Sequence, residues 1–165
     1  MHDQTKPGFD PAAFRTALGC FGTGVTIATC RDAGGKPVGI TINSFTSVSL
    51  DPPLILFCLG RTTRAYKAFM KADKFSINIL TTDQEALARH FSSPEAENWT
   101  QVQTLQTPDT GPPLLKNCLS QIVCHRHAVH PGGDHDILIG AVTELCLPED
   151  PPPLLYFRGQ YRRFS

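Results

Sequence analysis

The sequence predicts a mainly antiparallel β-barrel with a few short helices. Most of the periodic segments are short and either β-branched or alternating in polarity, which is typical of strands. Strands and helices do not alternate regularly along the chain, as they would in a doubly wound parallel sheet. At 165 residues, 41% of them hydrophobic, the chain is long enough to bury a core, and we expect a single domain over residues 1–165.

The N-terminal part predicts a short helix. Asp10 can cap the free backbone amides of a helix whose first residue is Pro11. Phe14 and Leu18 are four residues apart and share one face of this helix, which we expect to end near Gly19.

Strands follow this helix. Residues 24–29 and 38–43 are rich in β-branched side chains and flank the turn sequence of residues 32–35, so they predict a hairpin. Residues 44–50 alternate in polarity, and Asp51-Pro52-Pro53 separates them from the apolar run 54–59. We expect these two segments to be strands as well.

The middle of the chain predicts two helices around a strand. Thr62 or Thr63 can cap a helix that carries Phe69, and Thr82 with Glu85 forms a capping box for a second helix that reaches residue 91. Between them, residues 75–79 alternate as a strand.

The C-terminal part predicts three more strands. Residues 118–129 and 137–147 predict two long strands joined at Pro131-Gly132-Gly133, and residues 154–157 predict a last short strand.

The charge pattern excludes some classes of partner. The formal net charge is zero, and Lys and Arg outnumber Asp and Glu by 9 to 5 over residues 1–82, then fall behind by 6 to 10. This is a modest polarity and not a basic tract, so we expect no nucleic-acid partner. No apolar run approaches the roughly 20 residues that a membrane helix requires, so we expect no membrane partner.

The cysteines indicate a reducing compartment. The six cysteines include no CxxC pair, and the polar N-terminus MHDQTKPGFD has no signal-peptide character. We expect reduced thiols in a cytoplasmic protein.

A glycine-rich stretch, GCFGTG at residues 19–24, superficially suggests a dinucleotide-binding loop. Its glycines are ordered GxxGxG and precede a predicted strand, whereas the dinucleotide fingerprint joins a strand to a helix. We therefore interpret them as turn glycines.

The most informative stretch is GITINSFTSVSLDPPL, residues 39–54, which concentrates hydroxyls and an amide around a strand bend. Composition alone leaves open whether this is a solvated strand face or a binding surface. At this stretch the sequence resembles the flavin reductase family, the small reductase components of two-component flavin-dependent monooxygenases. Three further pieces carry the resemblance in the same order: TGVT at 23–26, GDH at 133–135 with Ile139-Gly140, and PLLYFRGQY at 153–161.

The resemblance implies a split β-barrel of the FMN-binding, Greek-key type that forms a homodimer, with a flavin near the subunit interface. It implies hydride transfer from NADH or NADPH to the N5 atom of FMN or FAD, and a separate monooxygenase that receives the reduced flavin. One alternative remains open, an FMN-binding electron carrier or sensor without rapid nicotinamide oxidation. An oxidase of the pyridoxamine-phosphate type on a similar barrel is disfavoured, because the matching block belongs to the reductases. The choices between FMN and FAD, between NADH and NADPH, and between bound and exchanging flavin also remain open.

The resemblance also implies the flavin-binding residues. Polar groups for the isoalloxazine ring come from Thr41, Asn43 and Ser44, and the contacts continue along Ser47, Val48 and Ser49. The predicted phosphate end comprises Cys58, Leu59, Arg61 and Thr63, since hydroxyls and a guanidinium favour a dianion. Phe91 and Ser92 are expected to close over the flavin chain. Tyr161, Arg162 and Arg163 are weaker candidates that could reach the site or a dimer partner.

Basic residues recur every three or four positions beyond this predicted phosphate end, at Arg61, Arg64, Lys67, Lys71 and Lys74. They place positive charge along one side of the predicted helix. A solvated face explains the last four without a ligand, while contact with nucleotide phosphates or an acidic partner is the alternative.

Histidines gather between Cys124 and Asp136. His125 and His127 share one strand face and could form part of a metal site, but no standard ligand spacing completes it, so we predict no metal. We interpret them, with His130, as exposed residues. His135 falls on the GDH motif of the family, and we predict that it positions the nicotinamide or stabilises charge; tying down the turn is the competing role.

Overall fold

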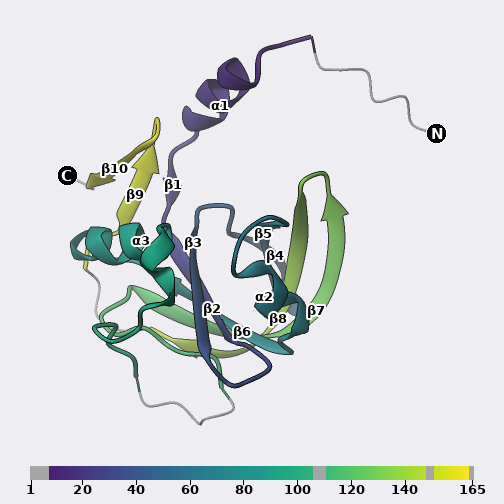
Figure 1. Ribbon diagram of the computed structural model, residues 1–165, viewed down its shortest axis with the longest axis vertical. Helices are drawn as coiled ribbons and strands as arrows, with labels where there is room; N and C mark the ends of the chain where they lie inside the picture. The colour runs from purple at the N-terminus through teal and green to yellow at the C-terminus, as the bar shows by residue number, and fades with distance from the viewer. Residues whose placement is uncertain (1–7, 106–110, 148–150, 164–165) are drawn as a thin grey trace.

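The structure, a computed structural model, describes residues 8–105, 111–147 and 151–163. Two antiparallel sheets dominate it: a seven-stranded sheet in the order β3-β2-β6-β7-β8-β5-β4 and a three-stranded sheet in the order β1-β9-β10 (Figure 1). The strands are β1 (Thr23–Gly24), β2 (Thr26–Arg31), β3 (Pro37–Ile42), β4 (Thr46–Leu50), β5 (Pro53–Gly60), β6 (Lys74–Ile79), β7 (Ser120–Gly132), β8 (His135–Cys146), β9 (Leu154–Phe157) and β10 (Gln160–Arg163). The prediction of a mainly β fold with a few short helices is confirmed.

The seven-stranded sheet curves around the main hydrophobic core. Ile42 of β3 and Ile55 of β5 belong to the same buried cluster, although their strands lie toward opposite ends of the sheet. Phe57 and Phe75 meet edge to face at its centre, with ring centroids 5.3 Å apart. The sheet is therefore rolled, which brings the end of β5 and the bend after β3 into one region.

A second core lies on the other face of β2. Ala28 belongs to the main cluster, whereas Ile27 packs with Leu80, Ala88 and Phe91 in the second one. Because both faces of the strand are covered, the side chains of residues 26–30 are all buried. This second core fixes α3 (Glu85–Phe91) against β3.

The predicted hairpins are confirmed. β2 pairs with β3, and β7 pairs with β8 along nearly their whole lengths. The last predicted strand has the bounds expected, but β10 was missed. The two-residue turn between β9 and β10 consists of Arg158 and Gly159, whose φ angles are both positive, at 50° and 75°. A two-residue turn of this kind matches the twist of a hairpin, and Gly159 was its one sequence signal.

The helix ends are predicted less well. Asp10 does cap α1 (Pro11–Gly19), by accepting from the amide of Ala12. The cap predicted for α2 (Tyr66–Lys71) is wrong, because the helix begins after Ala65 without a side-chain cap. The hydroxyl of Thr63 donates instead to the carbonyl of Gly60, at 2.8 Å.

The predicted capping box is shifted by one residue. It is formed by Thr81 and Gln84 around a 3₁₀ turn, η1 (Thr82–Gln84), which leads into α3. A further 3₁₀ turn, η2 (Pro94–Glu97), follows α3.

The N-terminal helix projects from the body of the molecule (Figure 1). Its apolar side chains are largely exposed: Phe14 by 49% and Leu18 by 59%, with the neighbouring Phe21 at 76%. Among the described residues, no helix has the length and apolar character to span a membrane. Residues 1–7, on which the prediction of no signal peptide partly rests, lie outside the described ranges.

All six cysteines are free thiols, as expected. Burial raises the pKa of Cys30 and of Cys124 to about 12, with Asp32 adding to the effect at Cys30. These two thiols are therefore held in the unreactive protonated form.

Candidate functional site

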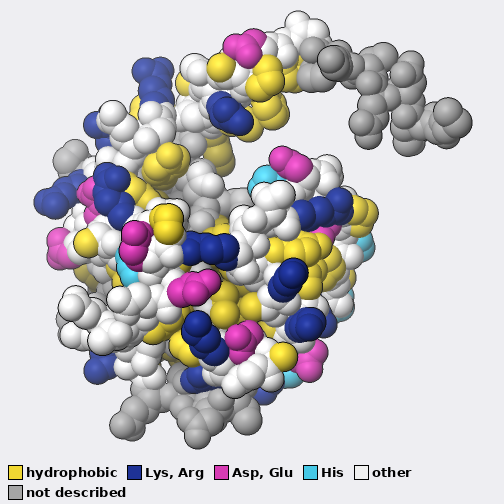
Figure 2. All heavy atoms as spheres, in the orientation of Figure 1, with side chains coloured by type: hydrophobic (Ala, Val, Ile, Leu, Met, Phe, Trp, Pro, Cys, Tyr) yellow, Lys and Arg dark blue, Asp and Glu magenta, His cyan; other side chains and the backbone are white. Residues whose placement is uncertain are grey.

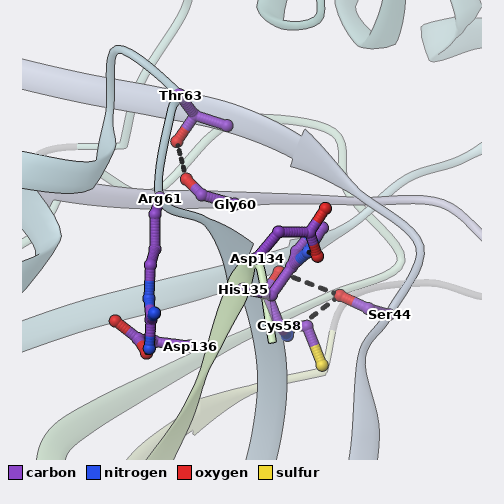
Figure 3. A network of polar contacts seen from close by, with 8 residues as sticks. All are labelled: Ser44, Cys58, Gly60, Arg61, Thr63, Asp134, His135 and Asp136. Atoms are coloured by element: carbon purple, nitrogen blue, oxygen red, sulfur yellow. Dashed lines mark hydrogen bonds and ion pairs between the residues drawn. The ribbon is translucent and has the colours of Figure 1, made fainter. Parts of the chain in front are cut away.

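The candidate site forms where the end of β5 meets the start of β8. Gly60 lies directly opposite His135, and Leu59 lies opposite Asp136. One residue further, the amide of Arg61 donates to the carbonyl of Asp134 at 3.0 Å. This pairing places the GDH turn beside the strand end that the sequence assigns to the flavin phosphate (Figure 3).

His135 is held at this junction by its neighbours. Its Nδ1 lies 2.7 Å from Oδ1 of Asp134, a carboxylate that can only accept, so Nδ1 carries the proton. The hydrogen bond to His135 lowers the pKa of Asp134. A Cβ on Gly60 would lie 3.4 Å from Nε2 of His135, so the imidazole lies against the strand backbone. The His135 side chain is 48% exposed and available to a ligand.

The bend between β3 and β4 is fastened to β5 by one hydroxyl. Oγ of Ser44 accepts from the amide of Cys58 at 3.0 Å and donates to the carbonyl of the same residue at 3.1 Å (Figure 3). Ser44 therefore positions the bend that carries Asn43, whose side chain is exposed.

The guanidinium of Arg61 turns toward Asp136 instead of toward the hydroxyl of Thr63 (Figure 3). Its Nε and Nη2 donate to Oδ1 of Asp136, and the hydroxyl of Tyr66 donates to Oδ2 at 2.5 Å. These hydrogen bonds, first from Arg61 and then from Tyr66, lower the pKa of Asp136. The predicted phosphate residues Arg61 and Thr63 are thus close in sequence but directed apart.

Two adjoining cavities lie near these residues; the first reaches Thr62 and Thr63, just after the end of β5, whereas Ser44, Cys58, Arg61 and His135 line neither. The first, of about 690 Å³, is bounded by the β2–β3 hairpin, α2 and the segment from α3 to η2. The predicted residues that line it are Thr41, Thr63, Phe91 and Ser92. The second, of about 620 Å³, is lined by Thr41, Asn43 and Ser92 together with residues of the β9–β10 hairpin. Since Thr41 and Ser92 line both, the cavities share a wall.

Several predicted residues lie outside these two cavities. Ser47, Val48 and Ser49 belong to β4, the strand at the edge of the sheet. The β4–β5 register shifts between Ser47 and Ser49, and Val48 is 45% exposed. Leu59 is 1% exposed, so it offers a ligand only its backbone.

Sequence reasoning missed residues that line the cavities. Arg89 of α3 lines the second cavity and lies over the ring of Tyr161, 4.8 Å from its centroid. Tyr161, a weaker candidate in the sequence, also meets Tyr156 edge to face. Lys36, in the β2–β3 turn, lines the first cavity. No local signal could have identified Lys36, since only the folded hairpin brings it to α2.

The other clustered histidines are exposed, as predicted. His125, His127 and His130 all lie on the solvent side of β7. Within the described ranges, no three His, Cys, Asp or Glu residues are placed to hold a metal ion.

Comparison with known proteins identifies the family. The model of the family described as "Flavin reductase like domain" matches residues 18–165 of this chain. The chain belongs to the flavin reductase family.

Individual members of the flavin reductase family cover nearly all of this chain. The reductase subunit of a flavin-dependent monooxygenase from Rhodococcus jostii is 40% identical over 152 residues, which are 92% of this chain and 77% of that protein. An FMN reductase (NADH) from Agrobacterium fabrum is 38% identical over 160 residues, 96% of this chain and 88% of the relative.

A solved structure extends the comparison to the fold. An NADH:FAD oxidoreductase of Streptomyces globisporus, in complex with NAD and FAD fragments, superposes with a TM-score of 0.89 at 32% identity. The match covers 99% of this chain and 98% of that chain. This chain therefore shares the mainly β fold, with a few short helices, of a flavin reductase of known structure.

Proposed function

We propose that this chain is an NAD(P)H-dependent flavin reductase. It transfers hydride from a reduced nicotinamide to FMN or FAD and supplies the reduced flavin to a separate monooxygenase. The observation that carries the proposal is the position of His135, fixed opposite Gly60 at the strand junction and next to the bend of Asn43 and Ser44. The match of residues 18–165 to the reductase family supports it.

The residues present fit a flavin. An isoalloxazine ring needs apolar surface on its faces and hydrogen-bonding groups along its pyrimidine edge, and its side chain ends in a phosphate. The first cavity combines the apolar side chains of Ile40 and Phe91 with the hydroxyl-bearing Thr41, Thr63 and Ser92. Pockets of roughly 300–1,000 Å³ with few polar groups are typical of cofactor sites.

The bound flavin supplies the redox chemistry by accepting hydride from the nicotinamide, and the protein binds and orients the two molecules. Asn43 offers an amide to the ring edge, in a position that Ser44 secures through Cys58. His135 keeps a proton on Nδ1 through Asp134, which would leave Nε2 as the imidazole nitrogen able to accept a hydrogen bond from a bound nicotinamide. The chain thus orders the reactants, which is the main protein contribution to such a transfer.

Steady-state oxidation of NADH and NADPH, followed at 340 nm with added FMN or FAD, tests the proposal. We expect flavin-dependent oxidation, and we expect the released reduced flavin to support a flavin-dependent monooxygenase added in trans. Binding of flavin without nicotinamide oxidation would instead identify an electron carrier or sensor. Oxidation of pyridoxamine phosphate would identify the barrel oxidase.

We further propose a homodimer of single-domain subunits. α1 packs no buried side chain against its own chain, and its apolar residues Phe14 and Leu18 lie on one face. Figure 2 shows hydrophobic side chains gathered on this projecting helix. Apolar surface of this kind is commonly covered by a partner, and a second copy of the chain is the partner we propose.

A further inference from the structure

Residues 62–65 form a loop in the wall of the first cavity. All four of them line it, between the end of β5 and the start of α2. The two residues that flank the loop, Arg61 and Tyr66, line neither of the two cavities. Any effect of these flanking residues on a ligand in the first cavity must therefore pass through the loop.

One carboxylate holds both flanks of this loop. Oδ1 of Asp136 accepts from the guanidinium of Arg61, which Figure 3 shows turned toward it. Oδ2 of the same carboxylate accepts from the hydroxyl of Tyr66 at 2.5 Å. The Asp136 side chain is only 9% exposed, so little water competes for these bonds. The hydrogen bond to Asp136 also raises the pKa of Tyr66, so the phenol keeps the proton that it donates.

The other contacts of the loop are local or lead away from β8. The amide and the hydroxyl of Thr63 both donate to the carbonyl of Gly60, at 3.1 and 2.8 Å. Arg64 donates to two carbonyls at the start of η2, and α2 begins without a side-chain cap. The Asp136 carboxylate therefore provides the side-chain link between this loop and β8.

Asp136 also follows His135 directly in the chain. The two residues begin β8 and lie opposite Leu59 and Gly60 of β5. Consecutive strand residues point to opposite faces of a sheet, and here the His135 side chain is 48% exposed whereas that of Asp136 is buried. One short segment thus presents an imidazole on one face and holds the cavity loop on the other.

We propose that Asp136 is a positioning residue for flavin reduction. Through its two partners it fixes the loop of residues 62–65, and thereby the phosphate end of the flavin, relative to His135. This inference rests on the proposed reductase function. Hydride transfer requires the two rings at contact distance, and a loop that is ordered before binding costs less conformational entropy when the ligand arrives. Arg61 then acts on the phosphate end through the loop and not by contact.

Flavin titrations followed by fluorescence quenching test this without turnover. Tyr66→Phe keeps the ring, which packs against the main core, and removes one hydrogen bond to Asp136. We expect the Kd of this variant for FMN to rise about five- to tenfold, because the ligand must then order the loop. Riboflavin lacks the phosphate, so its Kd should change by less than about twofold.

Turnover and a double variant test the same link. With saturating reduced nicotinamide and FMN, the kcat of Tyr66→Phe should fall about tenfold, while the KM for the nicotinamide changes by less than about twofold. Asp136→Asn should also weaken FMN binding more than riboflavin binding. Adding Tyr66→Phe to it should weaken FMN binding by less than about a further twofold, since both substitutions break one link.

Ser120→Ala is the matched control for a general loss of stability. It removes a hydrogen bond to the carbonyl of Cys146, at the opposite end of β8 from His135. Melting temperatures are measured for all variants. The control should bind FMN and riboflavin as wild type does, and its kcat should be unchanged, even where its melting temperature falls as far as that of Tyr66→Phe.

Three results would overturn the proposal: equal weakening of FMN and riboflavin in Tyr66→Phe, unchanged FMN binding in both Tyr66→Phe and Asp136→Asn, or the same loss of FMN affinity in Ser120→Ala. NADH and NADPH oxidation are measured on the same samples. Wild-type oxidation with any of these three results would remove the positioning role alone. Absence of wild-type oxidation with both FMN and FAD would remove the reductase function itself.

Discussion

Arg61 and Asp136 form a two-point contact across the ends of β5 and β8, with Nε and Nη2 donating to Oδ1 at 3.1 and 2.6 Å. Tyr66 of α2 completes it through Oδ2. The contact joins two strands and a helix beneath the turn that carries His135. It places a buried carboxylate under the candidate site, and that carboxylate depends on its two partners to remain ionised.

Replacing Asp136 by Asn should change how stability depends on pH. The folded state lowers the pKa of Asp136, so its stabilising effect is complete above the ordinary pKa of aspartate and is lost as the pH falls through the lowered value. We expect Asp136→Asn to lower the melting temperature at neutral pH and to reduce its fall on acidification. Glu144→Gln, at an exposed position, should follow the wild-type curve. Parallel curves for Asp136→Asn and wild type would contradict the assignment.

His135→Ala should impair nicotinamide turnover without unfolding the protein. The side chain is half exposed, so its loss leaves little buried space. We expect kcat/KM for the reduced nicotinamide to fall about 10- to 100-fold, with a small change in flavin affinity. His127→Ala, on the exposed face of β7, is the control and should be silent. Unchanged kinetics in His135→Ala would leave this residue only the role of fixing the turn.

Ser44→Ala should loosen the bend that carries Asn43. The substitution removes the hydroxyl that both accepts from and donates to the backbone of Cys58, at a cost of about 1–2 kcal/mol in the free energy of unfolding. Flavin should bind more weakly as well, because Asn43 loses its fixed position. Denaturant unfolding and flavin titration measure the two effects. Thr16→Ala, which removes a hydroxyl bond on the exposed α1, should affect neither.

Gly39→Ala should distort the wall of the first cavity. A Cβ there would lie 2.6 Å from Cε1 of Phe91, closer than carbon atoms can approach. We expect a loss of about 1–3 kcal/mol in unfolding free energy, and weaker flavin binding because Phe91 lines the first cavity. Gly24→Ala is the matched control, since a Cβ at Gly24 would meet no atom within 4 Å. If both variants behave alike, Phe91 is free to move aside.

Charged residues on the apolar face of α1 should disrupt the proposed dimer. Phe14→Glu with Leu18→Glu removes the exposed apolar pair, and sedimentation should then report a monomer. Arg15→Glu, on the same helix but outside that pair, should leave the dimer intact. A monomeric wild-type protein, or a dimer that persists in the double variant, would show that α1 is not the interface.

Local patterns account for much of the fold. The strands from Thr26 to Ile42 and the cap at Asp10 follow from alternation and from capping chemistry, both of which act within a few residues. The capping box was displaced by one residue because Thr81 and Thr82 are both suitable caps, and only the packed structure selects between them. The β10 strand is short and polar, and it depends on pairing with β9.

The sequence predicted which segments form the candidate site, but it did not predict how their side chains are arranged in space. The GDH turn and the polar bend were located by motif, and the structure brings Ser44, Cys58 and His135 into one region. The direction of Arg61 could not be predicted, because it depends on Asp136, 75 residues away in the sequence. The same holds for Lys36 and Arg89, whose positions in the cavities follow from tertiary packing alone.

The wall that the two cavities share has a thermodynamic consequence. Thr41 and Ser92 line both, and the hydroxyl of Thr41 donates to the carbonyl of Ala88 at 2.7 Å, which links β3 to α3. A ligand that shifts this link in one cavity also reshapes the other. Occupancy of the two cavities is then energetically coupled, and by linkage each ligand changes the affinity of the other by the same factor.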